Sequence, residues 1–252
     1  MASERTEVRL EFRGTSLEAL KWLVLSIIGA LFFVPLAWVN AAIARWICRS
    51  TEFSDGTTAV FRGTGGEVVV WHIFILLVTV GQQVLLAGNA DIFSIIPIMV
   101  VSYIAILAIV LTIIKWFIYN LQLNPGPHLT FTGSFPALLG WYALIAISGL
   151  TIVGWAWVAV AMYRWMASHV KGEGIAVEFR ATGLELLWRA LVVAFGSILI
   201  VTIPWLIIWF TRWLVQNVVL IRGVETAWGG FIEEQRTPPK PSWPAVPPLH
   251  RH

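Results

Sequence analysis

Apolar residues fill five long segments of the chain, and short stretches between them alternate polar with apolar residues. The segments lie at about residues 19–44, 68–88, 92–114, 137–163 and 186–211. Each is long enough for a helix, and a membrane-crossing helix needs about 20 such residues. Ahead of Phe12, Val8 and Leu10 alternate with charged residues, and a period of two is typical of a strand. The pattern therefore predicts short polar strands that lead into long apolar helices.

The strand-to-helix pattern occurs four times, and we call the copies units 1 to 4. Their junctions are FRGTSLEALKW at 12–22, FRGTGGEVVVW at 61–71, FTGSFPALLGW at 131–141 and FRATGLELLWR at 179–189. Each unit also closes its apolar region with a basic residue followed by tryptophan. Matches at both ends indicate a fourfold internal repeat. Unit 2 is about 21 residues longer than the others, and units 1 and 3 are offset by 119 residues, so the repeat divides into two halves.

Each unit carries a helix-start signal directly after its strand. In a capping box, threonine caps the first free amides of a helix and a glutamate three residues later bonds back to the cap amide. The predicted caps are Thr15 with Glu18, Thr64 with Glu67, Thr182 with Glu185, and Ser134, which has no glutamate partner. Carboxylates beside a membrane can also form a proton relay. The capping spacing alone explains these three glutamates, so we favour the structural interpretation.

Composition makes lipid the solvent for much of this surface. The chain is 58% hydrophobic and 12% charged, with a mean hydropathy of +0.79, whereas soluble domains carry about a quarter charged residues. The predicted fold class is an α-helical polytopic membrane protein with small β-strand or hairpin elements outside the bilayer. Its fourfold repeat forms membrane halves at 1–125 and 126–235, followed by a proline-rich tail at 236–252 with PxxP spacing. Turn signals such as Asp55-Gly56 predict the hairpins.

Two topologies fit the apolar segments. In the first, five helices cross the bilayer, and Trp22 and Trp46 mark its two interfaces about 36 Å apart. This topology places eight Lys and Arg residues on one side and nine on the other, with no positive-inside bias. In the second, breakers in units 1, 3 and 4 turn the chain back as re-entrant hairpins, and only 68–88 and 92–114 cross. The breakers are Pro35, Gly149 with Gly154, and Pro204.

The second topology is favoured because it places all 17 Lys and Arg residues on one face. That distribution, with a net charge of +3 and no run of basic residues, fits contact with anionic lipids and excludes nucleic-acid binding. Cys48 is the only cysteine, so no internal disulfide forms, and we expect it to be a small buried residue. The sequence contains no catalytic, cofactor-binding or metal-binding motif, and we expect none of these sites.

The repeat resembles the YjgN-like family of uncharacterised bacterial inner-membrane proteins. The resemblance covers about residues 8–223 and rests on TEFSDGTTAVFRGTGGE (51–67), GLTIVGWAWVAVAMYRW (149–165) and FRATGLELL (179–187). The family pattern has an F-x-G-T/S-G-x-E junction, a break with Ile-Tyr-x-Pro-Trp, and a basic cluster. Here Val-Gly-Trp-Ala-Trp replaces that break in unit 3, and one or two arginines replace the cluster. The resemblance implies a multi-pass protein of the bacterial inner membrane and no established activity.

Three polar residues in the second apolar segment form a possible intramembrane site. Gln82 and Gln83 lie in its middle and His72 near its start. Polar groups there are often functional, but they also serve as hydrogen bonds between helices. The residues expected to anchor the protein at the lipid interface are Trp22, Arg45, Trp46, Lys115, Trp116, Arg164, Trp165, Arg212 and Trp213.

Two functions fit these features. The first is a non-enzymatic membrane scaffold, which shapes the membrane or serves as an accessory subunit bound to a protein partner or to a second copy. The alternative is a transporter or channel subunit, since interrupted apolar segments within repeats indicate a transport site. In that alternative, Gln82, Gln83, Ser148 and Thr151 would line the path.

Overall fold

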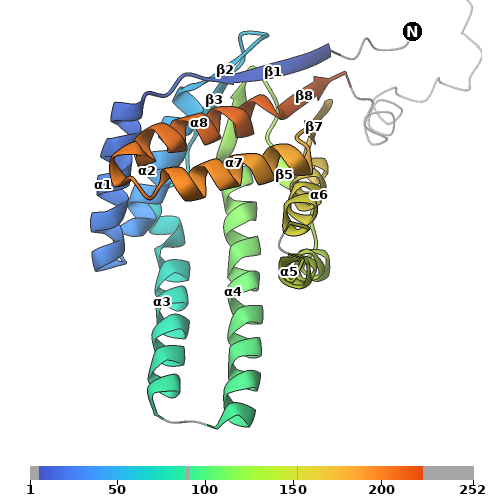
Figure 1. Ribbon diagram of the computed structural model, residues 1–252. Helices are drawn as coiled ribbons and strands as arrows, with labels where there is room; N and C mark the ends of the chain where they lie inside the picture. Colours follow the sequence, from blue (N-terminus) through green and yellow to red (C-terminus); the bar gives the residue numbers. More distant parts are fainter. Residues whose placement is uncertain (1–5, 89–90, 152, 224–252) are drawn as a thin grey trace, which may run out of the picture.

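The computed structural model describes residues 6–88, 91–151 and 153–223, and strands alternate with helical hairpins along this part of the chain (Figure 1). The predicted tail at 236–252 lies outside the described residues. Every unit has the order strand, helix, helix, strand. Unit 1 contains β1 (Thr6–Phe12), α1 (Ser16–Phe32), α2 (Leu36–Arg49) and β2 (Thr51–Phe53). Unit 2 contains β3 (Thr58–Phe61), α3 (Gly65–Ala87), α4 (Ile92–Asn120) and β4 (Leu121–Asn124).

Units 3 and 4 follow the same order. Unit 3 contains β5 (Thr130–Phe131), α5 (Phe135–Gly149), α6 (Trp155–Ser168) and β6 (Val170–Gly172). Unit 4 contains β7 (Ile175–Phe179), α7 (Gly183–Gly196), a short 3₁₀ turn η1 (Ile200–Thr202), α8 (Ile203–Gln216) and β8 (Val218–Arg222).

Within every unit the opening strand pairs antiparallel with the closing strand, and the register is the same in all four. The repeated phenylalanine always lies opposite the first residue of the closing strand. The four pairs are Phe12 with Thr51, Phe61 with Leu121, Phe131 with Val170, and Phe179 with Val218. This shared register lets residues near the two strands of one unit be matched to their counterparts in the others, counted from the phenylalanine or from the closing tryptophan.

Neighbouring units join through further strand pairs. β6 pairs with β7, and β8 pairs with β1, so the order β2-β1-β8-β7-β6-β5 forms one six-stranded antiparallel sheet. β3 and β4 form a separate two-stranded sheet, linked to the segment before β5 by a single bridge from Gln122 to His128. Helices also pack between units, α1 on α8, α2 on α3, α4 on α5 and α6 on α7. The four units therefore follow one another around a ring.

The helices of units 1, 3 and 4 are short because each hairpin turns where the sequence has a helix breaker. In unit 1, α1 ends at Phe32, Phe33 adopts φ +58°, and α2 begins after Pro35. The described helices of these units contain 14 to 17 residues. At 1.5 Å per residue they are about 21–26 Å long, less than the roughly 30 Å hydrocarbon core of a bilayer.

Only the helices of unit 2 reach the length and apolar character of a membrane span within the described residues. The two candidate spans are Gly65–Leu85 and Ile95–Asn120. Only 11% and 17% of their most apolar windows is buried inside the molecule, so neither is the core helix of a globule. Pro97 lies in the first turns of α4, where proline is tolerated.

The prediction of a polytopic membrane protein with small hairpins outside the bilayer is therefore wrong. Two helices, not five, have the length and composition of a span. The strands combine into a six-stranded sheet and a two-stranded sheet. The Asp55-Gly56 turn forms, with Gly56 at φ +78°, but β2 pairs with β1 and β3 with β4. Local turn chemistry specified the reversal of the chain and not the partner of either strand.

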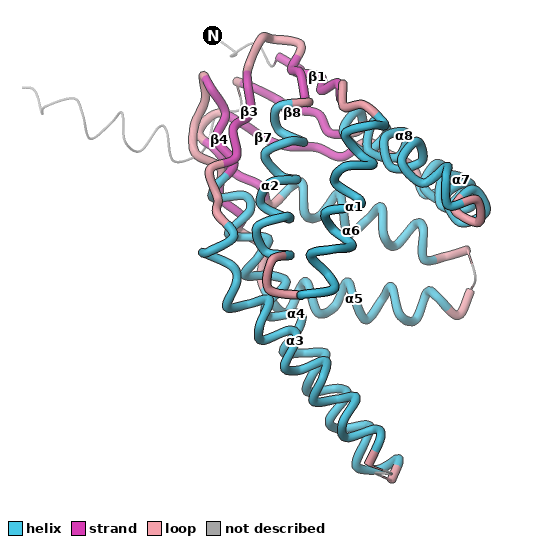
Figure 2. The backbone as a smooth tube through the Cα atoms, turned by 90° about the vertical axis from the view of Figure 1, so that its left-hand side faces the viewer, coloured by secondary structure: helices cyan, strands magenta, loops and turns pink. Residues whose placement is uncertain are grey.

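The core lies between the strands and the second helix of each hairpin. On α2 the buried positions are the small residues Ala37, Ala41, Ala44 and Cys48, which let strands and neighbouring helices approach closely. Cys48 is free and 7% exposed, as expected for a small buried residue. Figure 2 shows the strands gathered at one end of the molecule, with all four helical hairpins extending away from that end and splaying apart.

Candidate membrane-facing surface and apolar pocket

The repeated junction is built around a phenylalanine that meets the edge of the tryptophan closing the same unit. The four pairs are Phe12–Trp46, Phe61–Trp116, Phe131–Trp165 and Phe179–Trp213, with ring centroids 5.5, 5.3, 6.0 and 6.4 Å apart. The planes cross at 79–89°, the edge-to-face arrangement that aromatic quadrupoles favour. Trp213 is 5% exposed, so this predicted interface anchor lies in the core.

A small residue two positions after each phenylalanine makes room for these rings. A Cβ atom at Gly14, Gly63 or Gly133 would clash with the phenylalanine of the same junction, and unit 4 has the buried Ala181 there. A small residue at this position, glycine in three units and alanine in the fourth, is thus a packing requirement of the strand-to-helix junction. Trp22 lies half-buried beside Trp46, with ring centroids 6.3 Å apart.

The predicted caps differ between units. Thr15 and Thr182 form complete capping boxes, accepting from the amides of Glu18 and Glu185 at 3.3 Å, with each carboxylate accepting from the cap amide. Thr64 instead donates its hydroxyl to Glu67 at 2.9 Å.

The other Glu67 oxygen accepts from the Trp116 indole at 2.6 Å. Ser134 occupies the cap position without a side-chain cap bond. The three glutamates therefore bond to backbone, hydroxyl or indole groups of their own units.

In units 3 and 4, the arginine before the closing tryptophan has a role that was not expected from the sequence. Arg164 donates to the carbonyl of Ala181 at 2.7 Å, and Arg212 donates to the carbonyl of Gly14 at 3.4 Å. In both cases the arginine of one unit bonds the junction of the next unit around the ring. The second bond joins unit 4 to unit 1 and therefore links the two ends of the repeat.

A polar cluster joins two turns to strand β8 at the strand end of the molecule. Arg222 on β8 lies 3.1 Å from the Asp55 carboxylate and donates to the Thr57 hydroxyl at 2.6 Å and to the Pro125 carbonyl at 3.3 Å. Thr57 is 4% exposed. The cluster joins the β2–β3 turn and the β4–β5 turn to the closing strand, at the two places where the strand ladder is interrupted.

We expect Asp55→Asn to remove part of the acid sensitivity of folding. Burial opposes ionisation of Asp55, but hydrogen bonds from Thr57 and the Arg222 charge outweigh it and hold the pKa of Asp55 below its ordinary value. A lowered pKa stabilises the fold above the unfolded pKa, and this stabilisation is lost as the pH falls through the folded pKa. Near pH 7 the variant should lose about 1 kcal/mol. Thermal midpoints measured from pH 7 to pH 3 should converge with wild type at the acid end; parallel curves would contradict this account.

The hairpin tips expose large apolar side chains. Leu31 is 80% exposed at the α1–α2 tip, Leu150 85% at α5–α6, Ile200 79% at α7–α8 and Phe93 84% at α3–α4. The charges lie at the other end. Every described Lys and Arg is in a strand, a turn or the two helical turns nearest a strand. Asp91, between α3 and α4, is the one described acidic residue at a tip. The surface is thus divided into a charged strand end and apolar tips.

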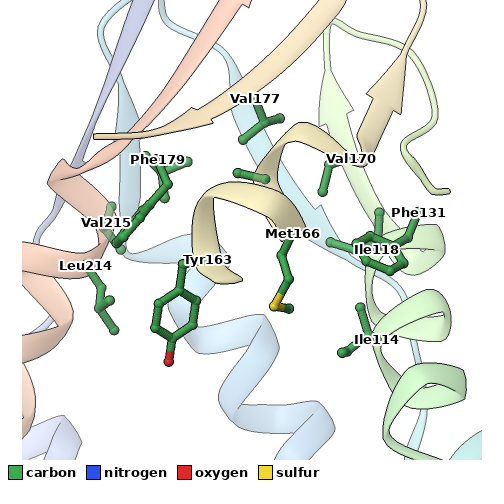
Figure 3. Close-up of a pocket in the computed structure, with 12 residues that line it drawn as sticks. Ile114, Ile118, Phe131, Tyr163, Met166, Val170, Val177, Phe179, Leu214 and Val215 are labelled. Atoms are coloured by element: carbon green, nitrogen blue, oxygen red, sulfur yellow. The ribbon is translucent and has the colours of Figure 1, made fainter. Parts of the chain in front are cut away.

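An apolar pocket of about 280 Å³ opens between the second helices of units 2, 3 and 4, beneath strands β5 to β8 (Figure 3). Ile114 on α4, Met166 on α6 and Leu214 on α8 contribute to its walls, and Phe179 on β7 closes it toward the strands. The Tyr163 hydroxyl is the only side-chain polar group of its lining. Such a lining suits hydrocarbon and offers nothing to hold an ion.

The predicted intramembrane polar site is not assembled as a path. His72 is buried on α3; its Nδ1 lies 3.0 Å from the Val68 carbonyl, and its Nε2 lies 3.2 Å from the Asn40 amide nitrogen on α2. The carbonyl can only accept, so we assign the proton to Nδ1, and Nε2 accepts from Asn40. Nδ1 is therefore used within α3, and Nε2 links α3 to α2. Among the described residues, no group of three or more His, Cys, Asp or Glu could hold a metal ion.

The glutamines are separated from the other residues proposed for transport. Gln82 is half-buried and Gln83 exposed on α3, which packs against α2 and α4. Ser148 and Thr151 lie at the far end of α5, which packs against α4 and α6. Their hydroxyls donate to the carbonyls of Ile145 and Ser148, within their own helical turns.

No protein-family model, curated protein or solved structure matches this chain. The predicted resemblance to the YjgN-like family therefore stays a prediction. The main functional feature of the described surface is its division between a charged strand end and apolar hairpin tips.

Proposed function

We propose that the protein is a non-enzymatic membrane scaffold, held in a bilayer by the α3–α4 hairpin and wedged into one leaflet by three shorter hairpins. The carrying observation is the separation of charge from exposed apolar surface. At all four tips, large apolar side chains are 79–85% exposed. Exposing them to water is unfavourable, whereas lipid would cover them. Covering one such side chain contributes about 1.5–3 kcal/mol.

The unequal lengths of the hairpins support wedging. The hairpins of units 1, 3 and 4 are too short to cross, so their tips would end inside the bilayer while α3 and α4 continue. The leaflet nearest the strands would then hold eight helices and the opposite leaflet two. Excess area in one leaflet favours curvature, which makes membrane shaping the proposed activity. The resemblance to the YjgN-like family supports the bacterial inner membrane as its location.

Depth measurements in vesicles test this proposal. In a Cys48→Ala background, single cysteines replacing Leu31, Leu150 or Ile200 would carry a fluorescent label. Lipids with a quencher midway along the acyl chain should quench all three labels, and iodide in the water should not. A label at Glu178, exposed on β7, is the matched control and should show the reverse. Iodide quenching of the tip labels equal to that at position 178 would exclude insertion.

Vesicle shape provides the test of activity. Reconstituted wild-type protein should reduce the mean vesicle diameter in proportion to the protein-to-lipid ratio. A variant with Leu31, Leu150 and Ile200 replaced by serine should retain its strand end and lose this effect. If wild-type protein inserts fully but vesicle diameter does not change, membrane shaping is excluded and membrane anchoring is not.

A further inference from the structure

A second cavity, the unit 1 cleft, has a chemistry opposite to that of the apolar pocket. It measures about 470 Å³ and lies where the start of α1 meets the end of α2. Three basic side chains, Lys21, Arg45 and Arg49, line it together with Trp22 and Trp46. Cations and aromatic rings therefore share one small hollow at the strand end of a hairpin.

None of the three cations of the unit 1 cleft forms an ion pair among the described residues. The arginines that do form ion pairs, Arg13, Arg180 and Arg222, lie outside this cleft. Lys21 lies over the Trp22 ring at 5.2 Å, and its charge also acts on the nearby Glu18 carboxylate without forming an ion pair.

Glu18 is the acidic residue of the cleft, but its carboxylate is held by the Thr15 amide and hydroxyl. Those hydrogen bonds lower the pKa of Glu18, so its carboxylate stays ionised and remains bonded to Thr15. Three cations and one carboxylate leave the cleft with an excess of two positive charges.

The repeat shows that basic residues occupy all three of these positions only in unit 1. The shared register places Lys21 opposite Val70, Gly140 and Trp188. It places Arg49 opposite Tyr119, Ser168 and Gln216. A basic residue recurs in all four units only at the position of Arg45.

Two of the Arg45 counterparts, Arg164 and Arg212, bond the next unit, whereas no such bond is formed by Arg45 among the described residues. The scaffold therefore does not require three cations at a junction. A different requirement is needed to explain their presence in unit 1.

We propose that the unit 1 cleft binds the phosphate headgroup of an anionic membrane lipid. Arg45 and Arg49 provide planar donor pairs that match phosphate oxygens, and Lys21 adds a point charge. Trp22 and Trp46 are amphipathic rings of the kind found at headgroup depth. The site rests on the proposed insertion, because only insertion brings the strand ends of the hairpins to the level of the headgroups.

Lipid binding by the detergent-solubilised protein tests the site. Native mass spectrometry would count bound lipids during titration with phosphatidylglycerol or phosphatidylcholine. We expect wild type to favour phosphatidylglycerol, and Lys21→Gln/Arg45→Gln/Arg49→Gln to weaken that binding on the order of 100-fold. The matched control removes three charges elsewhere, as Arg9→Gln/Arg62→Gln/Lys171→Gln, and should retain the preference. Equal losses in both triple variants would show a general charge effect and overturn the proposal.

Two further measurements distinguish failure of the headgroup site from failure of the proposed membrane insertion. Glycerol phosphate and inorganic phosphate should not displace phosphatidylglycerol at equal concentration; displacement would assign the cleft to a soluble anion. Flotation with neutral phosphatidylcholine vesicles tests insertion alone. Wild type that floats but shows no headgroup preference overturns only this site, whereas wild type that does not float overturns the proposed function. Circular dichroism of both triple variants should match wild type, since Lys21 and Arg49 are exposed.

Discussion

A cysteine that replaces Asp91 is expected to react with a membrane-impermeant thiol reagent only from the side opposite to cysteines at positions 56 and 173. Gly56 and Glu173 lie in turns between strands, at the charged end of the molecule. Position 91 lies between α3 and α4, whose helices are about 35 and 44 Å long and exceed the bilayer core. The difference should be all-or-none in oriented vesicles with a Cys48→Ala background.

A graft that shortens unit 2 provides the control for this labelling. Replacing residues 75–108 with residues 26–38 exchanges 34 residues for 13 and gives unit 2 the hairpin length of unit 1. A cysteine at the new tip should be inaccessible from either side. The same 13 residues placed at 145–157 leave the length of unit 3 unchanged and should not affect labelling at position 91. Labelling of 56 and 173 from opposite sides would contradict the ring arrangement.

Phe61→Ala is expected to lower the free energy of unfolding by about 3–5 kcal/mol, the range for removing a buried aromatic side chain. Phe61 is 3% exposed, stacks on Phe117 with centroids 5.1 Å apart, and meets the edge of Trp116. Its loss would leave a cavity at the point where β3, β4 and the end of α4 meet. Denaturant titration in mild detergent, followed by tryptophan fluorescence, measures the change.

Val60→Ala supplies the matched control for the phenylalanine. Val60 neighbours Phe61 on β3 but points to the other face and is 45% exposed, so its truncation should cost well under 1 kcal/mol. Gly63→Val should resemble Phe61→Ala, because a side chain at position 63 would meet the rings of Phe61 and Trp116. Equal effects of Phe61→Ala and Val60→Ala would show that the junction is not a packing centre.

Short-range features of the fold were accessible from the sequence, and long-range ones were not. Alternation located the strand at β1, and the Thr-x-x-Glu spacing located the starts of α1 and α7, because neighbouring residues determine both. The pairing of β1 with β8 joins residues more than 200 positions apart. No local pattern encodes it, since a polar strand can pair with any suitable edge.

In the candidate site, too, the sequence predicted the local motifs but not the contacts that they make with distant residues. The basic-Trp pairs were visible as a repeat, but their tryptophans pack against phenylalanines, and Arg164 and Arg212 bond carbonyls of the next unit. Amphipathic residues satisfy lipid interfaces and protein cores equally well, so composition could not choose between them. The three cations of the unit 1 cleft could be recognised as particular to that unit only from the shared register, which shows which residues of different units are equivalent.

Because β1 pairs with β8, the ring could begin at any of its units. A circularly permuted chain that begins at Thr58 and joins the old ends could close through the same strand pairs. A chain of only two units could likewise complete the ring with a second copy of itself, related by a twofold axis. The single polypeptide can thus be viewed as a covalently fused dimer of two-unit halves. That fusion allows unit 2 to lengthen and unit 1 to gain its cations without changing their counterparts.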